Sequence, residues 1–305
     1  MRILVCGGTG VIGHYLVPRL VARGHQVTVL ARTSERAQLA EAQGARTAAG
    51  DLFDVESLHT AAAGQDALLN VATHMPHTFP GRPSDFAIND RIRREGTGNV
   101  LAAAQKAGVT RVVLQSMIWV HGDQDGAWID ETAPLRPGPL GRSAVELEEQ
   151  GRAFAQRTGA TTTILRLGGL YAAESWHTRE IIDRLKKRLA PIIGHGDSYQ
   201  DFIHAADAAE AYARAVDAKR SATYFVTDDE PVRLGDYLAW LARASGAPAP
   251  FHVPQFVARM TLGHEMAAAY TASLRCRNDR IKADLGWAPK YPTFRDGYGE
   301  VLPRL

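Results

Sequence analysis

A glycine-rich turn near the start of the chain limits most strongly what the chain can fold into. Residues 2–6 form an apolar run of strand length, and an apolar helical pattern begins at residue 11. Gly7, Gly10 and Gly13 recur at three-residue steps. This spacing predicts a tight turn at Gly7, a backbone that approaches a pyrophosphate at Gly10, and a closely packed helix at Gly13. Because a helix N-terminus attracts anions, the predicted phosphate cradle consists of Gly7, Thr9, Gly10, Val11, Ile12 and Gly13.

The end of the second predicted strand, residues 26–30, indicates which dinucleotide is bound. An NAD site usually has a carboxylate about twenty residues after the glycines, where it binds the ribose 2′-hydroxyl. This chain has Arg32 there, and Arg36 follows one helical turn later. Guanidinium groups form forked hydrogen bonds with phosphate. The sequence therefore predicts NADPH as the cofactor, and the alternative is that both arginines are ordinary solvated charges.

The ends of the third and fourth predicted strands complete the expected cofactor site. Asp51 and Leu52 follow the third strand, where the carboxylate would accept from the adenine amino group and the leucine would cover the ring. The alternative is that Asp51 caps the helix that begins near Val55. Val71 and Ala72 end the fourth strand, and these small side chains would let the backbone come close to the cofactor.

Aromatic, histidine and methionine side chains follow three of the predicted strands. His74 and Met75 lie in the loop after the fourth strand, Met117 and Trp119 follow the fifth, and Tyr171 follows the sixth. Ligands bind at this edge of a parallel sheet, and such side chains suit a flat, hydrophobic ligand. We expect them to contact the substrate, although each could instead be a packing residue.

Composition excludes several classes of function. The 305 residues include 35 basic and 33 acidic side chains, a formal net charge of +2, so nucleic-acid binding is not expected. Two cysteines make neither a disulfide framework nor a metal cluster, and no metal is expected. No run approaches the roughly 18 apolar residues of a membrane span, and a strand at residue 2 leaves no room for a signal peptide. We therefore expect a cytoplasmic protein that binds a small-molecule ketone substrate. If the chain associates with itself, a homodimer is expected.

Several motifs in combination resemble extended short-chain dehydrogenases/reductases of the NAD-dependent epimerase/dehydratase type. They are residues 7–13, 50–52, 96–97, 107–109, 166–168, 201–207 and 285–289. The resemblance implies an α/β fold, a Rossmann-type doubly wound parallel sheet with a small C-terminal substrate-binding lobe. Strand and helix patterns that alternate from residue 2 to 167 predict the same sheet. The expected NADP-binding domain is residues 1–169 with 201–225 returning to it, and the lobe is residues 170–200 and 226–305.

The chain departs from this family where the chemistry is expected. The family uses a Tyr four residues before a Lys, because the ammonium lowers the phenol pKa and lets it exchange a proton with the substrate. The matching positions here hold Leu140 and Ala144. The Ser or Thr position falls on Met117, with Ser116 one residue earlier, and an Asn position on a long helix predicted over residues 84–107 holds Arg93. The usual proton relay is therefore predicted to be absent.

An NADPH-dependent ketoreductase is the favoured function, since hydride transfer needs chiefly the reduced cofactor and a carbonyl held beside it. Ser116 is the predicted hydrogen-bond donor to that carbonyl, and His121 the second candidate acid. A phenol beside the ketone would polarise the carbonyl internally, so aromatic polyketides are the expected substrates. The absence of the Tyr and Lys pair resembles that in atypical polyketide-tailoring reductases of antibiotic biosynthesis, which include angucyclinone ketoreductases.

Two other functions are compatible with the sequence. The loss of the relay residues is typical of a catalytically silent protein that binds NADP(H) as a sensor or scaffold. A nucleotide-sugar epimerase or dehydratase is the third possibility, and it would need a base that the sequence does not reveal.

Overall fold

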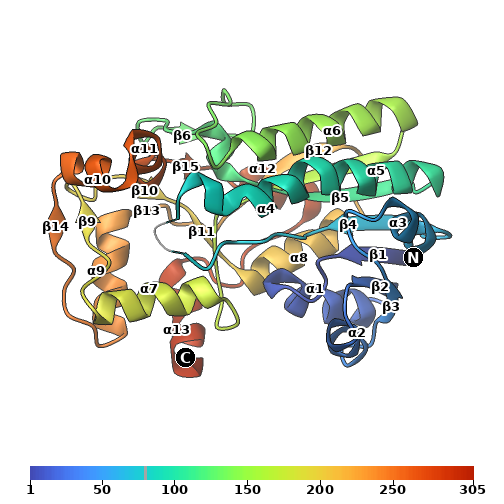
Figure 1. Ribbon diagram of the computed structural model, residues 1–305, viewed down its shortest axis with the longest axis horizontal. Helices are drawn as coiled ribbons and strands as arrows, with labels where there is room; N and C mark the ends of the chain where they lie inside the picture. The colour runs from blue at the N-terminus through green and yellow to red at the C-terminus, as the bar shows by residue number, and fades with distance from the viewer. Residues whose placement is uncertain (79–80) are drawn as a thin grey trace.

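Seven parallel strands form the central sheet of the computed structural model, which describes residues 1–78 and 81–305 (Figure 1). The strand order is β12-β7-β5-β4-β1-β2-β3. The bounds are β1 (Arg2–Cys6), β2 (Gln26–Ala31), β3 (Arg46–Ala49), β4 (Ala67–Asn70), β5 (Arg111–Met117), β7 (Thr161–Leu167) and β12 (Ala222–Val226). β4 is buried along its whole length, as expected of a parallel strand covered on both faces. The predicted α/β fold with a Rossmann-type doubly wound sheet is confirmed.

Helices cover both faces of this sheet (Figure 1). One face carries α1 (Val11–Ala22) and α8 (Ala205–Ala215), which pack against each other, and α2 (Ser34–Glu41) lies beside β2 and β3. The other face carries α3 (Val55–Ala62), α5 (Thr97–Lys106) and α6 (Arg142–Thr158). Alanines that recur along α8 let it approach α1 closely, and each fully buried leucine or phenylalanine of the two cores contributes about 1.5–3 kcal/mol.

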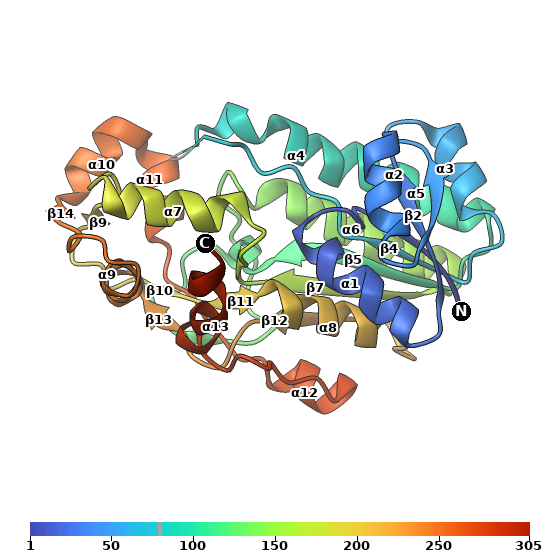
Figure 2. The same ribbon diagram turned by 90° about the horizontal axis from the view of Figure 1, so that it is seen from below.

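The remaining elements gather at the end of the molecule away from the N-terminus (Figure 2). The helices are α7 (Trp176–Lys186), α9 (Leu234–Ala244), α10 (Gln255–Leu262), α11 (His264–Thr271) and α13 (Phe294–Val301), whereas α12 (Asp279–Leu285) lies against β12 of the central sheet. Short strands pair as β8 (Gly169–Tyr171) with β11 (Phe202–His204), β9 (Ile192–Ile193) with β14 (His252–Val253), β10 (Tyr199–Gln200) with β13 (Val232–Arg233), and β6 (Trp128–Ile129) with β15 (Arg275–Cys276). A separate apolar core, which includes Ile182, Tyr237 and Phe294, holds α7, α9 and α13 together.

The long helix predicted over residues 84–107 is interrupted. A 3₁₀ turn (Pro83–Phe86) leads into α4 (Ala87–Arg91), a π-helical turn follows over Ile92–Gly96, and α5 then continues. A π turn inserts one extra residue into the helix, and such turns are frequent at functional sites. The extent of the predicted helix is therefore confirmed from Pro83 to Lys106, but the π turn was not predicted, because the apolar pattern carries no sign of a single inserted residue.

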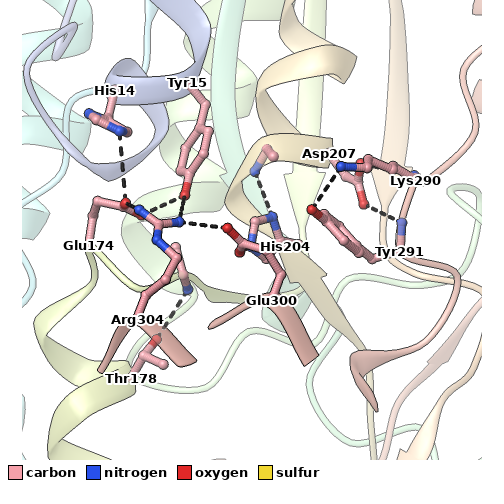
Figure 3. A network of polar contacts seen from close by, with 12 residues as sticks. His14, Tyr15, Glu174, Thr178, His204, Asp207, Lys290, Tyr291, Glu300 and Arg304 are labelled. Carbon is pink, nitrogen blue, oxygen red and sulfur yellow. Dashed lines mark hydrogen bonds and ion pairs between the residues drawn. The ribbon is translucent and has the colours of Figure 1, made fainter. Parts of the chain in front are cut away.

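A polar network ties the C-terminus to the first helix (Figure 3). The Tyr15 hydroxyl donates to Glu174 at 2.5 Å, and Arg304 pairs with both Glu174 and Glu300. His204 lies on the other side, with its Nε2 atom 3.3 Å from a Glu300 oxygen. The C-terminal segment is thus fixed against the element that carries the glycine-rich turn.

Candidate active site

One cavity of about 1620 Å³ lies at the carboxyl ends of β1, β2, β4, β5 and β7, and residues of the C-terminal helices close it. Most of the predicted site residues line it. They are Gly7, Thr9, Gly10, Val11, Ile12, Arg32, Arg36, Asp51, Leu52, Val71, Ala72, His74, Met75, Ser116, Met117, Trp119, Leu140 and Tyr171. Gly13, His121 and Ala144 are not part of its wall. The residues predicted to bind the cofactor and those predicted to contact the substrate therefore share one cavity.

The glycine-rich turn has the backbone geometry of a phosphate cradle. Gly7 has a φ of +85°, and a Cβ atom there would lie 2.6 Å from the backbone nitrogen of Ala72. A Cβ atom on Gly13 would lie 2.1 Å from the carbonyl oxygen of Gly8, so the close packing that we predicted for Gly13 is against the turn. Gly10 closes the turn with a 3.0 Å hydrogen bond to the Gly7 carbonyl. This cradle and the α1 N-terminus fit the pyrophosphate of a dinucleotide.

Two arginines stand at the adenosine end of the cavity. Arg36 donates to the backbone carbonyl of Thr9 at 3.0 Å, which draws its guanidinium toward the glycine-rich turn. Arg32 is 71% exposed and has its Nη1 atom 3.8 Å from a carboxylate oxygen of Asp51. Both side chains line the cavity.

Asp51 does not cap the helix that follows it. The N-cap of α3 is Asp54, whose carboxylate accepts from the backbone of Glu56 at 3.2 Å. Asp51 instead accepts from the backbone nitrogen of Phe53 at 2.8 Å and lines the cavity beside that ring. The sequence analysis missed Phe53, whose ring centroid lies 3.8 Å from the guanidinium carbon of Arg91. The alternative of Asp51 as a helix cap was therefore wrong.

Ser116 directs its proton away from the cavity. Its hydroxyl donates to Glu148 at 2.6 Å, and the residue is only 3% exposed. A hydroxyl has a single proton, so Ser116 cannot donate to a substrate carbonyl while this bond holds. The geometry contradicts the predicted donor role of Ser116.

His121 faces the protein interior. The turn formed by Ile118–His121 carries its ring into the core, where it is fully buried. Arginine can only donate, so the 2.8 Å contact with Arg166 makes Nε2 the acceptor, and Nδ1 donates to the Pro134 carbonyl at 3.2 Å. Burial and the neighbouring Arg166 charge lower the pKa of His121 to about 4. The prediction that His121 supplies a proton was wrong.

Glu148 is the centre of a buried polar network that the sequence analysis missed. Arg166 donates two bonds to its carboxylate, at 2.8 and 2.7 Å, and Arg152 adds a third at 2.6 Å. Burial alone would raise the pKa of Glu148, but the bonds and charge of Arg166 outweigh burial and hold that pKa below its usual range. The available signals were an arginine inside an apolar strand and a glutamate on the apolar face of α6.

His121 gives the protein a pH-dependent stability. A histidine whose folded pKa is about 4 and whose unfolded pKa is near 6.5 stabilises the fold fully above pH 6.5 and loses that contribution as the pH falls toward 4. At about 1.4 kcal/mol per pKa unit, the loss reaches up to roughly 3 kcal/mol. Urea unfolding measures the free energy of unfolding at pH 5 and at pH 7.5. The change in this free energy between the two pH values should be smaller for His121→Gln than for the wild type. His264 is exposed, so His264→Gln should show the same change with pH as the wild type. If His121→Gln also showed the wild-type change, His121 would not be the source of the pH dependence.

An arginine contacts the positions at which the relay was expected. Leu140 lines the cavity, and Ala144 is buried on α6. Arg93 donates to the Leu140 carbonyl at 3.1 Å and to the Ser143 hydroxyl at 3.2 Å, and its Nη2 lies 3.0 Å from the sulfur of Met117. Its guanidinium therefore contacts the Tyr position (Leu140), the Ser or Thr position (Met117) and the first turn of α6 (Ser143).

The predicted substrate contacts come together on the apolar part of the wall. His74, Met75, Met117 and Trp119 line the cavity and keep part of their surface exposed. Tyr171 also borders the cavity, but it is only 2% exposed, and its ring stacks on that of Tyr298 at 4.7 Å. Tyr171 is thus largely a packing residue.

Comparison with known proteins identifies the family. A model of the NAD dependent epimerase/dehydratase family matches residues 3–226, which include the glycine-rich turn and the whole parallel sheet. The chain belongs to this family. Two proteins similar to this chain are named as reductases, and together they support an NAD(P)-dependent oxidoreductase.

The first of these relatives is the 3-diazoavenalumate denitrifying reductase of a Streptomyces species. It is 34% identical over an alignment of 306 positions that covers 98% of this chain and 99% of that protein. The second is the 4-hydroxy-2-methyl-3-oxo-4-farnesyl-3,4-dihydroquinoline-1-oxide ketoreductase of Stigmatella aurantiaca. It is 31% identical over 269 residues, 87% of this chain and 79% of that protein.

Solved structures of the family share the fold. The dTDP-glucose 4,6-dehydratase of Streptomyces venezuelae, solved with NAD bound, superposes with a TM-score of 0.82 at 24% identity and covers 100% of this chain and 96% of that one. The UDP-glucose 4-epimerase of Thermus thermophilus in complex with NAD has a TM-score of 0.80 at 23% identity, and the match covers 100% of this chain and 98% of that one.

Among residues 1–78 and 81–305, no helix has the length and apolar character to cross a membrane. The same residues contain no group of three or more His, Cys, Asp or Glu side chains that could hold a metal.

Proposed function

We propose that this chain is an NADPH-dependent ketoreductase that transfers hydride to the carbonyl of a small aromatic substrate of polyketide type. The observation that carries the proposal is that the dinucleotide cradle and an apolar wall share one cavity, with Leu140 and Ala144 at the positions of the family's acid relay. The two relatives named as reductases support hydride chemistry, and one of them is a ketoreductase.

The residues of the chain bind and orient the reactants. Gly7, Gly10 and the α1 N-terminus would hold the pyrophosphate, and Arg32 and Arg36 the ribose 2′-phosphate. When bound, the reduced cofactor supplies the hydride that forms the new C–H bond. The C=O π electrons then move to the oxygen, which takes a proton from a neighbouring phenol of the substrate and ultimately from water. Met117, Trp119 and other apolar side chains exclude water from the ring faces.

A diazo-bearing substrate is the second candidate. The relative that spans nearly the whole chain is named for a diazo acid and for denitrifying reduction. The terminal nitrogen of a diazonium group accepts hydride without an acid, because the group is already cationic, and the resulting diazene loses N2 and leaves its hydrogen on carbon. This chemistry also suits a site without the Tyr and Lys pair.

A substrate panel tests the proposal. NADPH oxidation, followed by its absorbance, should occur with phenolic polycyclic ketones and not with simple ketones. Oxidation with an arenediazonium salt alone would favour the second candidate. Tight NADPH binding without oxidation of any panel member would contradict the proposal and favour a sensor or scaffold. Interconversion of nucleotide sugars without net NADPH consumption would favour an epimerase.

Cofactor preference has its own prediction. Arg36→Ala should weaken NADPH binding about tenfold, because a hydrogen bond to a charged group is worth about 1.5–3 kcal/mol, and should leave NADH binding unchanged. Fluorescence titration with both cofactors measures the difference. Arg46→Ala, an exposed arginine on β3 outside the cavity, is the matched control. Equal weakening of NADPH and NADH by Arg36→Ala would contradict the assignment of the 2′-phosphate site.

A further inference from the structure

Arg93 is a half-buried cation on the wall of the cavity. It lies in the π-helical turn Ile92–Gly96 between α4 and α5, and that turn sets the direction of its side chain relative to the flanking helices. Burial lowers the pKa of Arg93 to about 10, with the charge of Asp90 acting in the opposite direction. The guanidinium is therefore still protonated at neutral pH.

No carboxylate of the described chain pairs with this guanidinium. Within residues 1–78 and 81–305, no Asp or Glu oxygen lies within 4.0 Å of an Arg93 nitrogen. Asp90, the nearest acidic neighbour, accepts from Ser143 at 2.5 Å. The next residue, Arg94, differs sharply, because it pairs with Glu146 at 2.5 Å and approaches Asp90 at 3.9 Å. A charge that is partly withdrawn from water normally has a partner of opposite sign, and Arg93 has none within ion-pair distance among the described residues.

The hydrogen-bond partners of Arg93 are all neutral, and they do not use all of its N–H groups. They are a carbonyl, a hydroxyl and the Met117 thioether, and sulfur is a weak acceptor. Arginine has five N–H groups, and these three bonds leave the Nε proton and one Nη2 proton without a described protein partner. Two free N–H groups on one guanidinium are what the two oxygens of a carboxylate can accept.

We propose that Arg93 binds a carboxylate of the substrate, which makes aromatic carboxylates the preferred substrate class of this cavity. This inference rests on the proposed function in one respect: the carboxylate bound by Arg93 is taken to belong to the molecule that is reduced. The phosphates of the cofactor have their own cradle at Gly7 and Gly10, on a different strand end. Met117, Trp119 and Leu140 provide the apolar wall that an aromatic ring attached to the carboxylate would contact.

Binding of a matched pair of probes tests this assignment without any turnover. 2-Naphthoate and its uncharged amide have nearly the same shape, and calorimetric titration of the full chain saturated with NADP⁺ gives both dissociation constants. We expect naphthoate to bind the wild type at least tenfold more tightly than the amide. The preference should disappear in Arg93→Met, fall partly in Arg93→Lys, and persist in Arg94→Met, which removes the neighbouring surface arginine.

The controls separate binding from folding. Arg93→Gln keeps a donor to the Leu140 carbonyl and removes the charge, so it replaces Arg93→Met if that variant fails to bind NADP⁺ normally. No preference for naphthoate in the wild type, or a preference that survives both Arg93→Met and Arg93→Gln, would overturn the proposal. If naphthoate is preferred but no panel member oxidises NADPH, the proposed reductase fails and the carboxylate site stands.

Discussion

Replacing Glu148 with alanine is expected to lower the free energy of unfolding by about 3–5 kcal/mol, the cost of breaking a buried pair by removing one partner. Arg166 is 2% exposed, and it donates from Nε and Nη2 to Glu148 and from Nη1 to His121. Its charge would therefore remain buried without a counter-ion. Ser116 would also lose its acceptor. Urea unfolding at neutral pH measures the change.

Glu149→Ala is the matched control, since Glu149 is exposed on the same helix turn. It should change the free energy of unfolding by less than about 0.5 kcal/mol. If Glu148→Ala were no more destabilising than Glu149→Ala, the network behind Ser116 would not be the structural centre that its geometry indicates. Such a result would also restore Ser116 as a candidate donor to the substrate.

Gly13→Ala is expected to lower both stability and cofactor affinity. Its new Cβ atom would lie 2.1 Å from the Gly8 carbonyl oxygen, a backbone atom that cannot rotate away. Helix α1 must therefore move from the turn, at a cost of about 1–3 kcal/mol. Because that movement opens the phosphate cradle, NADPH binding should weaken at least tenfold, or about 1.4 kcal/mol.

A second glycine-to-alanine change separates this contact from a general helix effect. Gly299 is exposed on α13, and a Cβ atom there would meet no atom within 4 Å. Gly299→Ala should raise stability by roughly 0.5–1 kcal/mol, because alanine loses less backbone entropy in a helix, and should leave NADPH binding unchanged. Similar behaviour of the two variants in thermal unfolding and in fluorescence titration would contradict the packing role of Gly13.

The expected cofactor residues could be named from the sequence because their signals are local. The strand, turn and helix around Gly7 and Gly13 lie within about one βα unit, and their backbone geometry is set by residues that contact one another in the chain.

The catalytic half was harder to predict because it depends on contacts between distant residues. The direction of Ser116 is decided by Glu148, 32 residues later, and that of His121 by Arg166, 45 residues later. Neither spacing repeats a helix or strand period. The sequence did show that Arg93 replaces an expected Asn, but only the fold places its guanidinium beside Leu140 and Met117.

The most direct test of the proposed reductase is isotope transfer under single-turnover conditions. NADPH deuterated at its transferable position is mixed with the protein and a phenolic polycyclic ketone, and the products are analysed by mass spectrometry and NMR. The account predicts one deuterium on the carbinol carbon of the product alcohol. Full occupancy of the cofactor site with no deuterium in any recovered compound, across ketone and diazonium substrates, would contradict it.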